Sequence, residues 1–243
     1  MTGGNLMKLE IFDDADAVAR AGASAIAAES RAAVRSRGLF TLAVSGGHTP
    51  WIMLRALAGE DVPWARVNLF QVDERVAPDG HADRNLTHLR ESLLQLVPLG
   101  PDQMHAMPVE SPDLEAAAAQ YASVLRQVAG SPPVLDLVHL GLGPDGHTAS
   151  LLPGDPALDI DTADVAVTGV YQGRRRMTLT YPVLNRARRV LWIVTGSEKV
   201  EMLRRLRAGD RSIPAGRVRS EEALLLADRA ATGGLATQTG SGA

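Results

Sequence analysis

The hydrophobic residues of this chain form short continuous runs that alternate with longer amphipathic stretches. Short apolar runs rich in β-branched and aromatic residues are typical of strands buried on both faces of a sheet, whereas apolar positions at helical spacing predict helices. The runs predict strands at residues 9–12, 39–44, 67–72, 103–107, 135–140, 165–170, 177–180, 190–194 and 223–227. The amphipathic stretches predict helices at residues 15–37, 51–57, 85–96, 113–129 and 197–207.

Strands that alternate with helices are joined by right-handed crossovers, which place the strands parallel in one sheet with helices on both faces. No linker rich in Pro, Gly or Ser and no repeat interrupts the alternation before residue 232. The pattern therefore predicts a single α/β domain over residues 8–231, with a largely parallel, Rossmann-like sheet flanked by helices. Residues 232–243 are predicted to form a disordered C-terminal tail.

Composition narrows the range of functions. The 243 residues include 25 Lys+Arg and 28 Asp+Glu, a formal charge of −3, which offers no electrostatic surface for nucleic acid. The absence of cysteine excludes disulfides, thiolate metal sites and cysteine nucleophiles. No apolar run is long enough to span a membrane and the N-terminus lacks a signal-peptide pattern, which favours the cytoplasm. All but two of the basic residues are arginines, the lysines being Lys8 and Lys199.

The first candidate site follows the second predicted strand. Ligands of open parallel sheets bind outside the carboxyl ends of the strands, where helix N-termini present free N–H groups. Ser45-Gly46-Gly47 stands between a strand and a helix, and its glycines allow the backbone to approach and surround a phosphate. The segment lacks the Gly-Lys-Ser/Thr ending of a nucleotide P-loop. We interpret it as a phosphate-binding loop, with a plain structural turn as the alternative.

Charged residues at two further strand ends favour an anionic ligand. Asp73-Glu74-Arg75 comes directly after an apolar strand, although such charges are also common in solvated loops. Arg174-Arg175-Arg176 precedes another strand, where alternation prevents all three side chains from facing one way. Lys199 is predicted in the first turn of a helix, where the macrodipole disfavours a cation unless an anion is bound nearby. These positions predict a small phosphorylated substrate.

The loop at residues 141–147 offers reactive groups. It reads Gly141-Leu142-Gly143-Pro144-Asp145-Gly146-His147, and its glycines match the dinucleotide-binding fingerprint. Asp145 would bring a carboxylate to the pyrophosphate, and Pro144 removes a backbone donor, so we disfavour dinucleotide binding. Histidine has an unperturbed pKa suited to proton transfer near neutral pH, which makes Asp145 and His147 candidates for acid–base chemistry.

Several short sequence motifs are spread along most of the chain. They are Ser45-Gly46-Gly47-x-Thr49-Pro50, Asp73-Glu74-Arg75-Val76-x-Pro78 with Asn85, Gly141-Leu142-Gly143-x-Asp145-Gly146-His147-Thr148-Ala149-Ser150-Leu151-x-Pro153, Arg176-Met177-Thr178-Leu179-Thr180, Gly196-x-x-Lys199 and Ile213-Pro214-Ala215. In order and spacing they resemble the 6-phosphogluconolactonase family, from about residue 8 to residue 231. The segment from Asp145 to Ser150 is the most specific piece.

The resemblance implies hydrolysis of 6-phospho-D-glucono-1,5-lactone to 6-phospho-D-gluconate, the second step of the oxidative pentose phosphate pathway. It also implies the fold shared with glucosamine-6-phosphate deaminases and ribose-5-phosphate isomerases, with no metal or organic cofactor. The partner is then a small phosphorylated sugar lactone, and we expect neither nucleic acid nor membrane binding. We expect a monomer or a weak homo-oligomer.

The chain departs from these relatives at two places. The family often has Lys-Pro-Pro shortly before the strand that begins at Arg176, whereas this chain has Tyr171-Gln172-Gly173. Arg174 or Arg175 is a candidate for the missing charge. The deaminase relatives have a catalytic Glu before the proline of the shared loop, where this chain has Leu152. That difference disfavours ring-opening deamination or isomerisation.

A mechanism follows as a hypothesis. A lactone is an activated ester, so its hydrolysis needs a deprotonated water and a stabilised oxyanion rather than a covalent nucleophile. We expect His147 to be the general base, with Asp145 or Asp73 orienting its imidazole. Arg75 is expected to meet sugar oxygens or developing charge. The residues expected to hold the 6-phosphate are Ser45, Gly46, Gly47, Arg176 and Lys199.

Four alternatives are kept beside this hypothesis. A phosphosugar isomerase or deaminase would share the fold. A Ser–His esterase would use Ser45 or Ser150, although neither lies in a Gly-x-Ser-x-Gly elbow. A sugar-phosphate sensor would need an attached DNA-binding module, for which a strand that begins by residue 9 leaves no room. A metal-dependent hydrolase would be built on Asp73, Asp145 and His147.

Overall fold

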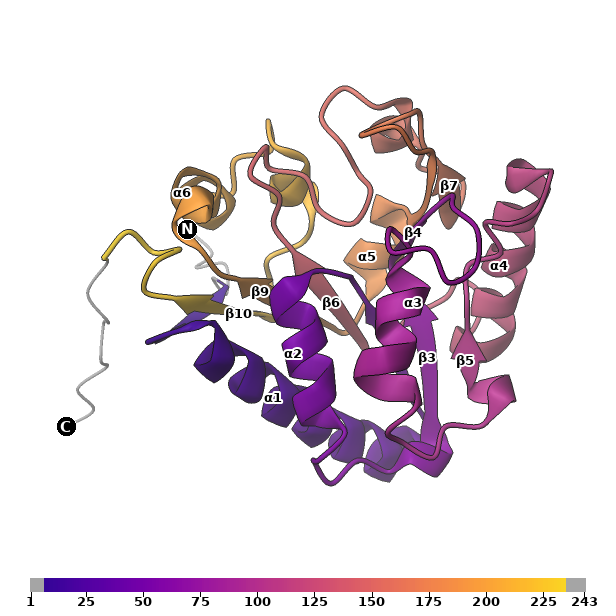
Figure 1. The fold of residues 1–243 in the computed structure, drawn as a ribbon, viewed down its shortest axis with the longest axis horizontal. Coiled ribbons are helices and arrows are strands. Elements are labelled where there is room, and N and C mark those ends of the chain that lie inside the picture. The colour runs from indigo at the N-terminus through magenta and orange to yellow at the C-terminus, as the bar shows by residue number, and fades with distance from the viewer. Residues whose placement is uncertain (1–6, 235–243) are drawn as a thin grey trace.

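Seven parallel strands make the central sheet of the protein, which we describe from a computed structural model over residues 7–234. Their spatial order is β1-β10-β9-β6-β2-β3-β5, and every neighbouring pair is parallel (Figure 1). The strands are β1 (Lys8–Phe12), β2 (Phe40–Val44), β3 (Val67–Gln71), β5 (Met104–His105), β6 (Leu137–Gly141), β9 (Arg189–Val194) and β10 (Ala223–Asp228). The predicted α/β class with a largely parallel sheet is confirmed.

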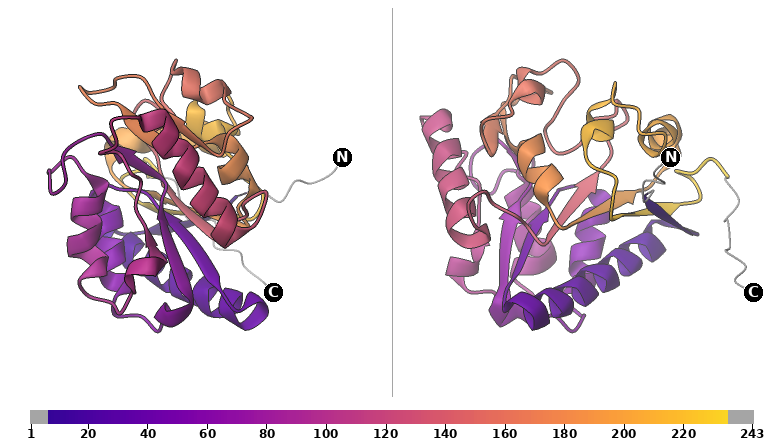
Figure 2. Two further views of the ribbon diagram at one scale, coloured as in Figure 1. Left: turned by 90° about the vertical axis from the view of Figure 1, so that its right-hand side faces the viewer. Right: turned by 180° about the vertical axis from the view of Figure 1, so that it is seen from behind.

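Helices cover both faces of this sheet. On one face lie α1 (Ala15–Arg37), α2 (His48–Leu57) and α3 (Asn85–Leu89), and on the other lie α4 (Leu114–Ala129), α5 (Tyr181–Arg186) and α6 (Val200–Arg207) (Figures 1 and 2). Side chains alternate along each strand, so Phe40 and Leu42 join the core beneath α1 and α2, while Ala43 joins the opposite core. Burial on both faces is the reason for the continuous apolar runs in the sequence.

Several element boundaries differ from the predicted ones. The helix predicted at residues 85–96 is α3 followed by a π-helical turn, Arg90–Leu94. The helix predicted at residues 197–207 starts with a 3₁₀ turn, Ser197–Lys199, before α6. Helix α2 begins three residues earlier than predicted, and α5 was not predicted because six residues are too few to show a helical period.

A second, antiparallel sheet lies beyond the carboxyl end of β3. It contains β4 (Asp73–Arg75), β8 (Arg176–Leu179) and β7 (Val165–Val167) in the order β4-β8-β7. The sequence analysis treated residues 73–75 as a charged strand end, because three charged residues carry no strand periodicity. They become a strand only by pairing with β8, a segment remote in sequence.

Two of the expectations from sequence concern membrane-spanning segments and the C-terminal residues. No helix within residues 7–234 is long and apolar enough to cross a membrane. Of the predicted tail, residues 232–234 belong to a turn after β10, and residues 235–243 lie outside the described residues. The assignment of residues 8–231 to a single domain stays a prediction.

Candidate active site

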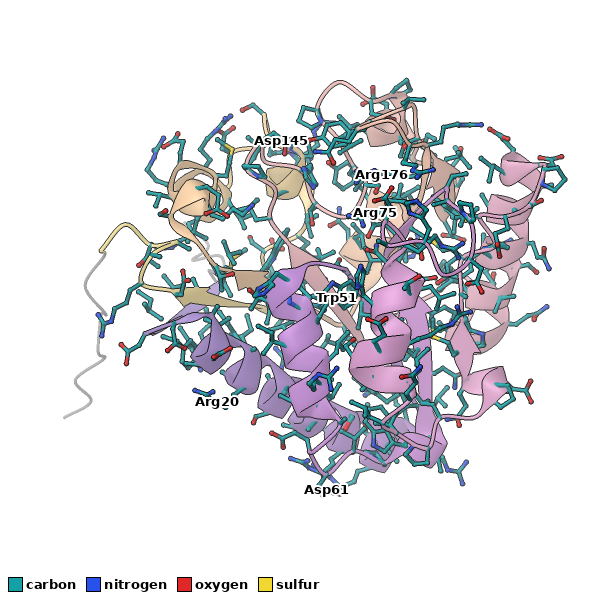
Figure 3. All side chains as sticks on the ribbon, viewed as in Figure 1. Arg20, Trp51, Asp61, Arg75, Asp145 and Arg176 are labelled. Atoms are coloured by element: carbon teal, nitrogen blue, oxygen red, sulfur yellow. The ribbon has the colours of Figure 1, made fainter. Side chains whose placement is uncertain are left out.

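A cavity of about 330 Å³ opens where β2, β3, β6 and β9 end. Every residue expected to take part in catalysis or phosphate binding lines it, except Asp145, which contacts the lining residue His147. Figure 3 labels Arg75, Arg176 and Asp145 at this edge of the sheet. Arg20 of α1 and Asp61, which follows α2, are labelled far from it. The lining residues named in the sequence analysis are Ser45, Gly46, Gly47, Asp73, Arg75, His147, Arg176 and Lys199.

His147 is paired with a carboxylate. Its Nδ1 lies 2.5 Å from Oδ1 of Asp145, and its backbone N–H donates to the same oxygen at 3.1 Å. Burial opposes ionisation of Asp145, but the charge and hydrogen bonds of His147 outweigh it, so the pKa of Asp145 lies below its usual value. The ionised Asp145 accepts a hydrogen bond from Nδ1–H of the imidazole and leaves Nε2 facing away from the carboxylate as the nitrogen that can accept a proton.

Gly143 makes room for this pair. A Cβ at Gly143 would lie 2.1 Å from Nδ1 of His147 and 2.7 Å from Oδ1 of Asp145. Such contacts are far inside van der Waals range, so any larger residue must displace the two side chains. Gly143, which matches one position of the dinucleotide-binding fingerprint in the sequence, therefore leaves the space that the acid–base pair occupies. The loop also uses its own donors, since Gly143 N–H donates to the carbonyl of His147 and Gly146 N–H to that of Gly143.

Substituting Gly143 by alanine is expected to lower kcat about tenfold, because displacing a catalytic group by a fraction of an ångström misaligns it. Gly59→Ala is the control, since Gly59 does not line the cavity, its φ is not positive, and a Cβ there would meet only the Ala56 carbonyl oxygen at an ordinary contact distance of 3.5 Å. Steady-state kinetics on both folded variants checks the effect. Equal kcat values for the two variants would show that Gly143 does not shape the pair.

Asp73 is engaged elsewhere. Its Oδ2 accepts a 2.6 Å hydrogen bond from the Ser150 hydroxyl, and its Oδ1 accepts one from the Asn85 amide at 3.3 Å. Of the two acids considered for orienting His147, the structure thus brings Asp145 to the imidazole and holds Asp73 with Ser150 and Asn85. Ser150 is fully buried, so it is inaccessible as a nucleophile.

Two arginines lie side by side on neighbouring strands of the small sheet. Arg75 of β4 stands directly opposite Arg176 of β8, an arrangement in which like charges destabilise a sheet. Neither guanidinium forms an ion pair with a carboxylate in residues 7–234, and the Nε of each is buried without a hydrogen-bond partner. Burial and the positive charge of Arg75 lower the pKa of Arg176. A bound anion would relieve both the repulsion and the missing hydrogen bonds.

The other two members of the arginine triplet point elsewhere. Arg174 pairs with Asp83 at 3.0 Å, and Arg175 pairs with Glu115 at 2.7 Å. Neither lines the cavity. The three side chains are therefore separated as expected, because Arg174 closes the turn and only Arg176 belongs to β8, but the idea that Arg174 or Arg175 supplies a missing charge to the site is wrong.

The loop after β2 is held in place by His139. Nδ1 of this histidine accepts the Ser45 N–H at 3.3 Å, and its carbonyl accepts the Ser45 hydroxyl at 3.0 Å. Both donors of Ser45 are thus used within the fold. The backbone N–H groups of Gly46 and Gly47 meet no acceptor among the described residues, and the first N–H groups of α2 have none within the helix. The donors available to an anion therefore begin at Gly46.

His139 predicts a pH dependence of stability. Its burial lowers its pKa from 6.5 to about 3, so it stays neutral in the fold while it protonates below about pH 6.5 in the unfolded chain. The contribution of His139 to the free energy of unfolding should therefore be constant above pH 6.5. Below that pH it should fall by about 1.4 kcal/mol per pH unit, until about pH 3.

The measurement is urea unfolding of wild type and His139→Gln at several pH values from 7 to 4. Because all other groups are common to both proteins, the difference between their slopes isolates His139. The variant is expected to lose less stability on acidification, and parallel curves would contradict the assignment of a neutral buried His139.

Lys199 reaches the cavity from the segment that follows β9. It ends the 3₁₀ turn after β9, and its side chain is 18% exposed, with Nζ 3.7 Å from Glu198. Asp228 accepts the backbone N–H of Gly196 with both carboxylate oxygens, which anchors this loop to the end of β10. The hydroxyls of Thr49 and Thr195 join the loop to the start of α2 at 2.7 Å.

Sequence reasoning gave no role to Glu74, which organises the region. Its fully buried carboxylate accepts backbone N–H groups from Arg75, Asn85 and Leu86 and forms an ion pair with Arg84. It therefore connects β4 to the start of α3 and sets the position of Arg75. The only signal in the sequence was its place between two candidate residues.

The site offers no arrangement for a metal ion. Among the described residues, no group of three or more His, Asp and Glu side chains is placed to hold one. The three residues considered for such a centre are divided between two hydrogen-bonded groups, Asp145 with His147 and Asp73 with Ser150.

This fold and site define a class of α/β protein with a cavity at the carboxyl edge of a parallel sheet, lined by two arginines and placed beside a histidine–carboxylate pair. The family model described as "Glucosamine-6-phosphate isomerases/6-phosphogluconolactonase" matches residues 13–226, and the chain belongs to this family. The resemblance read from the motifs is thereby confirmed.

Individual relatives agree with this assignment. The chain is 39% identical over 175 residues to a 6-phosphogluconolactonase of Synechocystis sp., covering 70% of this chain and 72% of that protein. It is 35% identical over 235 residues to a 6-phosphogluconolactonase of Mycobacterium tuberculosis, covering 91% and 95% of the two chains. The crystal structure of a 6-phosphogluconolactonase from Thermotoga maritima matches with a TM-score of 0.81 at 26% identity, covering 91% of this chain and 98% of that one.

Proposed function

We propose that this protein is a 6-phosphogluconolactonase, which hydrolyses 6-phospho-D-glucono-1,5-lactone to 6-phospho-D-gluconate in the oxidative pentose phosphate pathway. Its similarity to enzymes of that name over most of their length supports the activity. The observation that carries the proposal is the pairing of Arg75 and Arg176, without a carboxylate partner, in the same cavity as His147. Positive charge without a carboxylate partner among the described residues, together with a proton acceptor in the same cavity, suits a phosphorylated ester, whose phosphate and developing oxyanion are both negative.

The phosphate is held away from the reacting carbon. Backbone N–H groups of Gly46 and Gly47, the N-terminus of α2, Arg176 and Lys199 supply donors and positive charge to its oxygens. Ser45 supports the loop through its bonds to His139. Binding energy gained at the phosphate positions the lactone carbonyl for attack.

The chemistry takes place at His147. Its Nε2 takes a proton from a water molecule as the oxygen of that water attacks the lactone carbonyl carbon, and Asp145 stabilises the resulting imidazolium. Negative charge on the carbonyl oxygen is stabilised by Arg75. When the intermediate collapses, the bond from C1 to the ring oxygen breaks, and the imidazolium returns its proton to that oxygen. The product is the open-chain acid.

Asp73 contributes to substrate binding rather than to the orientation of His147. Its carboxylate lines the cavity while Ser150 and Asn85 hold it from behind. A carboxylate so placed accepts hydrogen bonds from sugar hydroxyl groups.

The rival chemistries fit the site less well. The Ser45 hydroxyl donates to a backbone carbonyl and the Ser150 hydroxyl to Asp73, so neither is activated by a histidine. Leu152 stands where the deaminase relatives have a catalytic acid, and it is a buried apolar residue. Ring-opening deamination or isomerisation therefore lacks its acid here.

Location, oligomeric state and cofactor requirement are also part of the proposal. We place the enzyme in the cytoplasm, as a monomer or a weak homo-oligomer. It needs neither metal nor organic cofactor, because the described site supplies a base and anion donors from its own side chains.

The decisive experiment generates the lactone with glucose-6-phosphate dehydrogenase and detects the product with 6-phosphogluconate dehydrogenase. The lactone also opens spontaneously, so the observable is acceleration above a protein-free blank, measured before and after exhaustive chelation. Acceleration that survives chelation is expected. An unchanged blank rate would reject the lactonase assignment, and loss on chelation would reject the metal-free mechanism.

A further inference from the structure

The hairpin tip between β7 and β8 places a tyrosine beside the acid–base pair. Tyr171 and Arg174 exchange backbone hydrogen bonds of 2.9 and 3.2 Å, and the two residues between them, Gln172 and Gly173, have φ of +51° and +77°. These are the features of a two-residue hairpin turn of the primed type, whose twist matches that of the strands it joins. The ion pair of Arg174 with Asp83 ties the turn to the segment after β4.

The hydroxyl of Tyr171 reaches the acid of the pair. It donates to Oδ2 of Asp145 at 3.3 Å, while His147 occupies Oδ1. The two oxygens of one carboxylate are thus held by different side chains, which fixes the plane of the carboxylate. Burial and the negative charge of Asp145 raise the pKa of Tyr171, so the phenol keeps its proton and remains the donor.

The ring of Tyr171 contacts two further site residues. The guanidinium carbon of Arg176 lies 5.0 Å from the ring centroid, within the range of a cation–π interaction. The imidazole of His147 lies at a centroid distance of 6.1 Å and meets the ring at 66°. Gln172, the next residue, accepts from the Arg176 guanidinium at 3.3 Å. Tyr171 therefore contacts Asp145, His147 and Arg176.

We propose that Tyr171 is a positioning residue that links the acid–base pair to the phosphate-binding arginine. The proposal rests on the lactonase function and on the assignment of His147 and Arg176 within it. The hydroxyl keeps Asp145 aligned with His147, which affects the chemical step. The ring face keeps the Arg176 guanidinium directed into the cavity, which affects binding of the phosphate. One side chain thus makes two contributions that substitution can separate.

The test compares Tyr171→Phe with Tyr171→Leu. Phenylalanine removes only the hydroxyl, so kcat is expected to fall about three- to tenfold with KM unchanged. Leucine removes the ring as well, so KM for the phosphorylated lactone is expected to rise in addition, while KM for unphosphorylated glucono-1,5-lactone stays the same. A merely structural role would not divide kcat and KM between the two variants.

Val170→Ala is the matched control, because Val170 precedes Tyr171 and is 71% exposed. It should retain the kinetics of wild type. Circular dichroism and thermal unfolding establish that each variant is folded. A wild-type kcat in Tyr171→Phe, or identical kinetics in the phenylalanine and leucine variants, would overturn the proposal. Failure of the wild-type protein to accelerate lactone opening would instead overturn the lactonase function itself, so the two failures are distinguishable.

Discussion

Replacing His147 by asparagine is expected to lower kcat for 6-phosphogluconolactone by about 10²- to 10⁴-fold, the range that a general base contributes. Asparagine keeps the approximate size of the imidazole and a donor toward Asp145 but has no basic nitrogen. KM should change little, because the proposed phosphate contacts come from other residues. The comparison requires subtraction of the spontaneous rate, which sets the lowest measurable activity.

His48 supplies the matched control for this variant. His48 also lines the cavity, at the first position of α2, but no carboxylate within residues 7–234 pairs with it as Asp145 pairs with His147. His48→Asn is expected to retain most of the wild-type kcat. If His147→Asn were nearly as active as wild type, or if His48→Asn were the inactive variant, the base assignment would be wrong.

Removing the Arg176 guanidinium is expected to raise KM for the phosphorylated lactone about 10- to 100-fold, since hydrogen bonds to charged groups are the strong ones. The effect on unphosphorylated glucono-1,5-lactone should be small, because that substrate never engages the phosphate site. Lys199→Ala should behave in the same way. The expected signature is therefore a change in the ratio of kcat/KM for the two substrates.

Arg175→Ala is the control for this pair of variants. Arg175 precedes Arg176 in the same hairpin, and its substitution also removes a guanidinium, but its partner is Glu115 outside the cavity. It should leave the substrate ratio unchanged. Equal losses on both substrates in Arg176→Ala and Lys199→Ala would remove these residues from the phosphate site.

The parts of the site that were predicted from sequence are those with a local cause. The loop at Ser45-Gly46-Gly47 lies between an apolar run and a helix, and both elements form where the pattern indicates. Asp145 and His147 are two residues apart in one turn, so their contact needs no distant partner. Such features depend on turn chemistry and strand periodicity, which neighbouring residues already contain.

The parts that were missed have partners remote in the chain. Residues 73–75 form β4 only against β8, and that pairing places Arg75 opposite Arg176. The residue order gave no role to His139 of β6, which supports the loop of Ser45 after the neighbouring strand β2. Tyr171 entered only as a departure from the family pattern. None of these contacts has a periodic signal, because each depends on which strands become neighbours.

Residue order alone was sufficient for the strand and helix alternation, the carboxyl-edge location of the site, the family and its reaction. These conclusions rest on local patterns and on motifs that can be recognised from the residue order without knowledge of the fold. Tertiary structure decided that Asp73 is held by Ser150 and leaves Asp145 as the acid at His147, that only Arg176 of the triplet 174–176 lines the cavity, and that Tyr171 contacts both functional groups. The partners of Asp73, Arg176 and Tyr171 are set by sheet register and by the direction in which each side chain leaves the backbone, because these contacts exist only once distant segments pair.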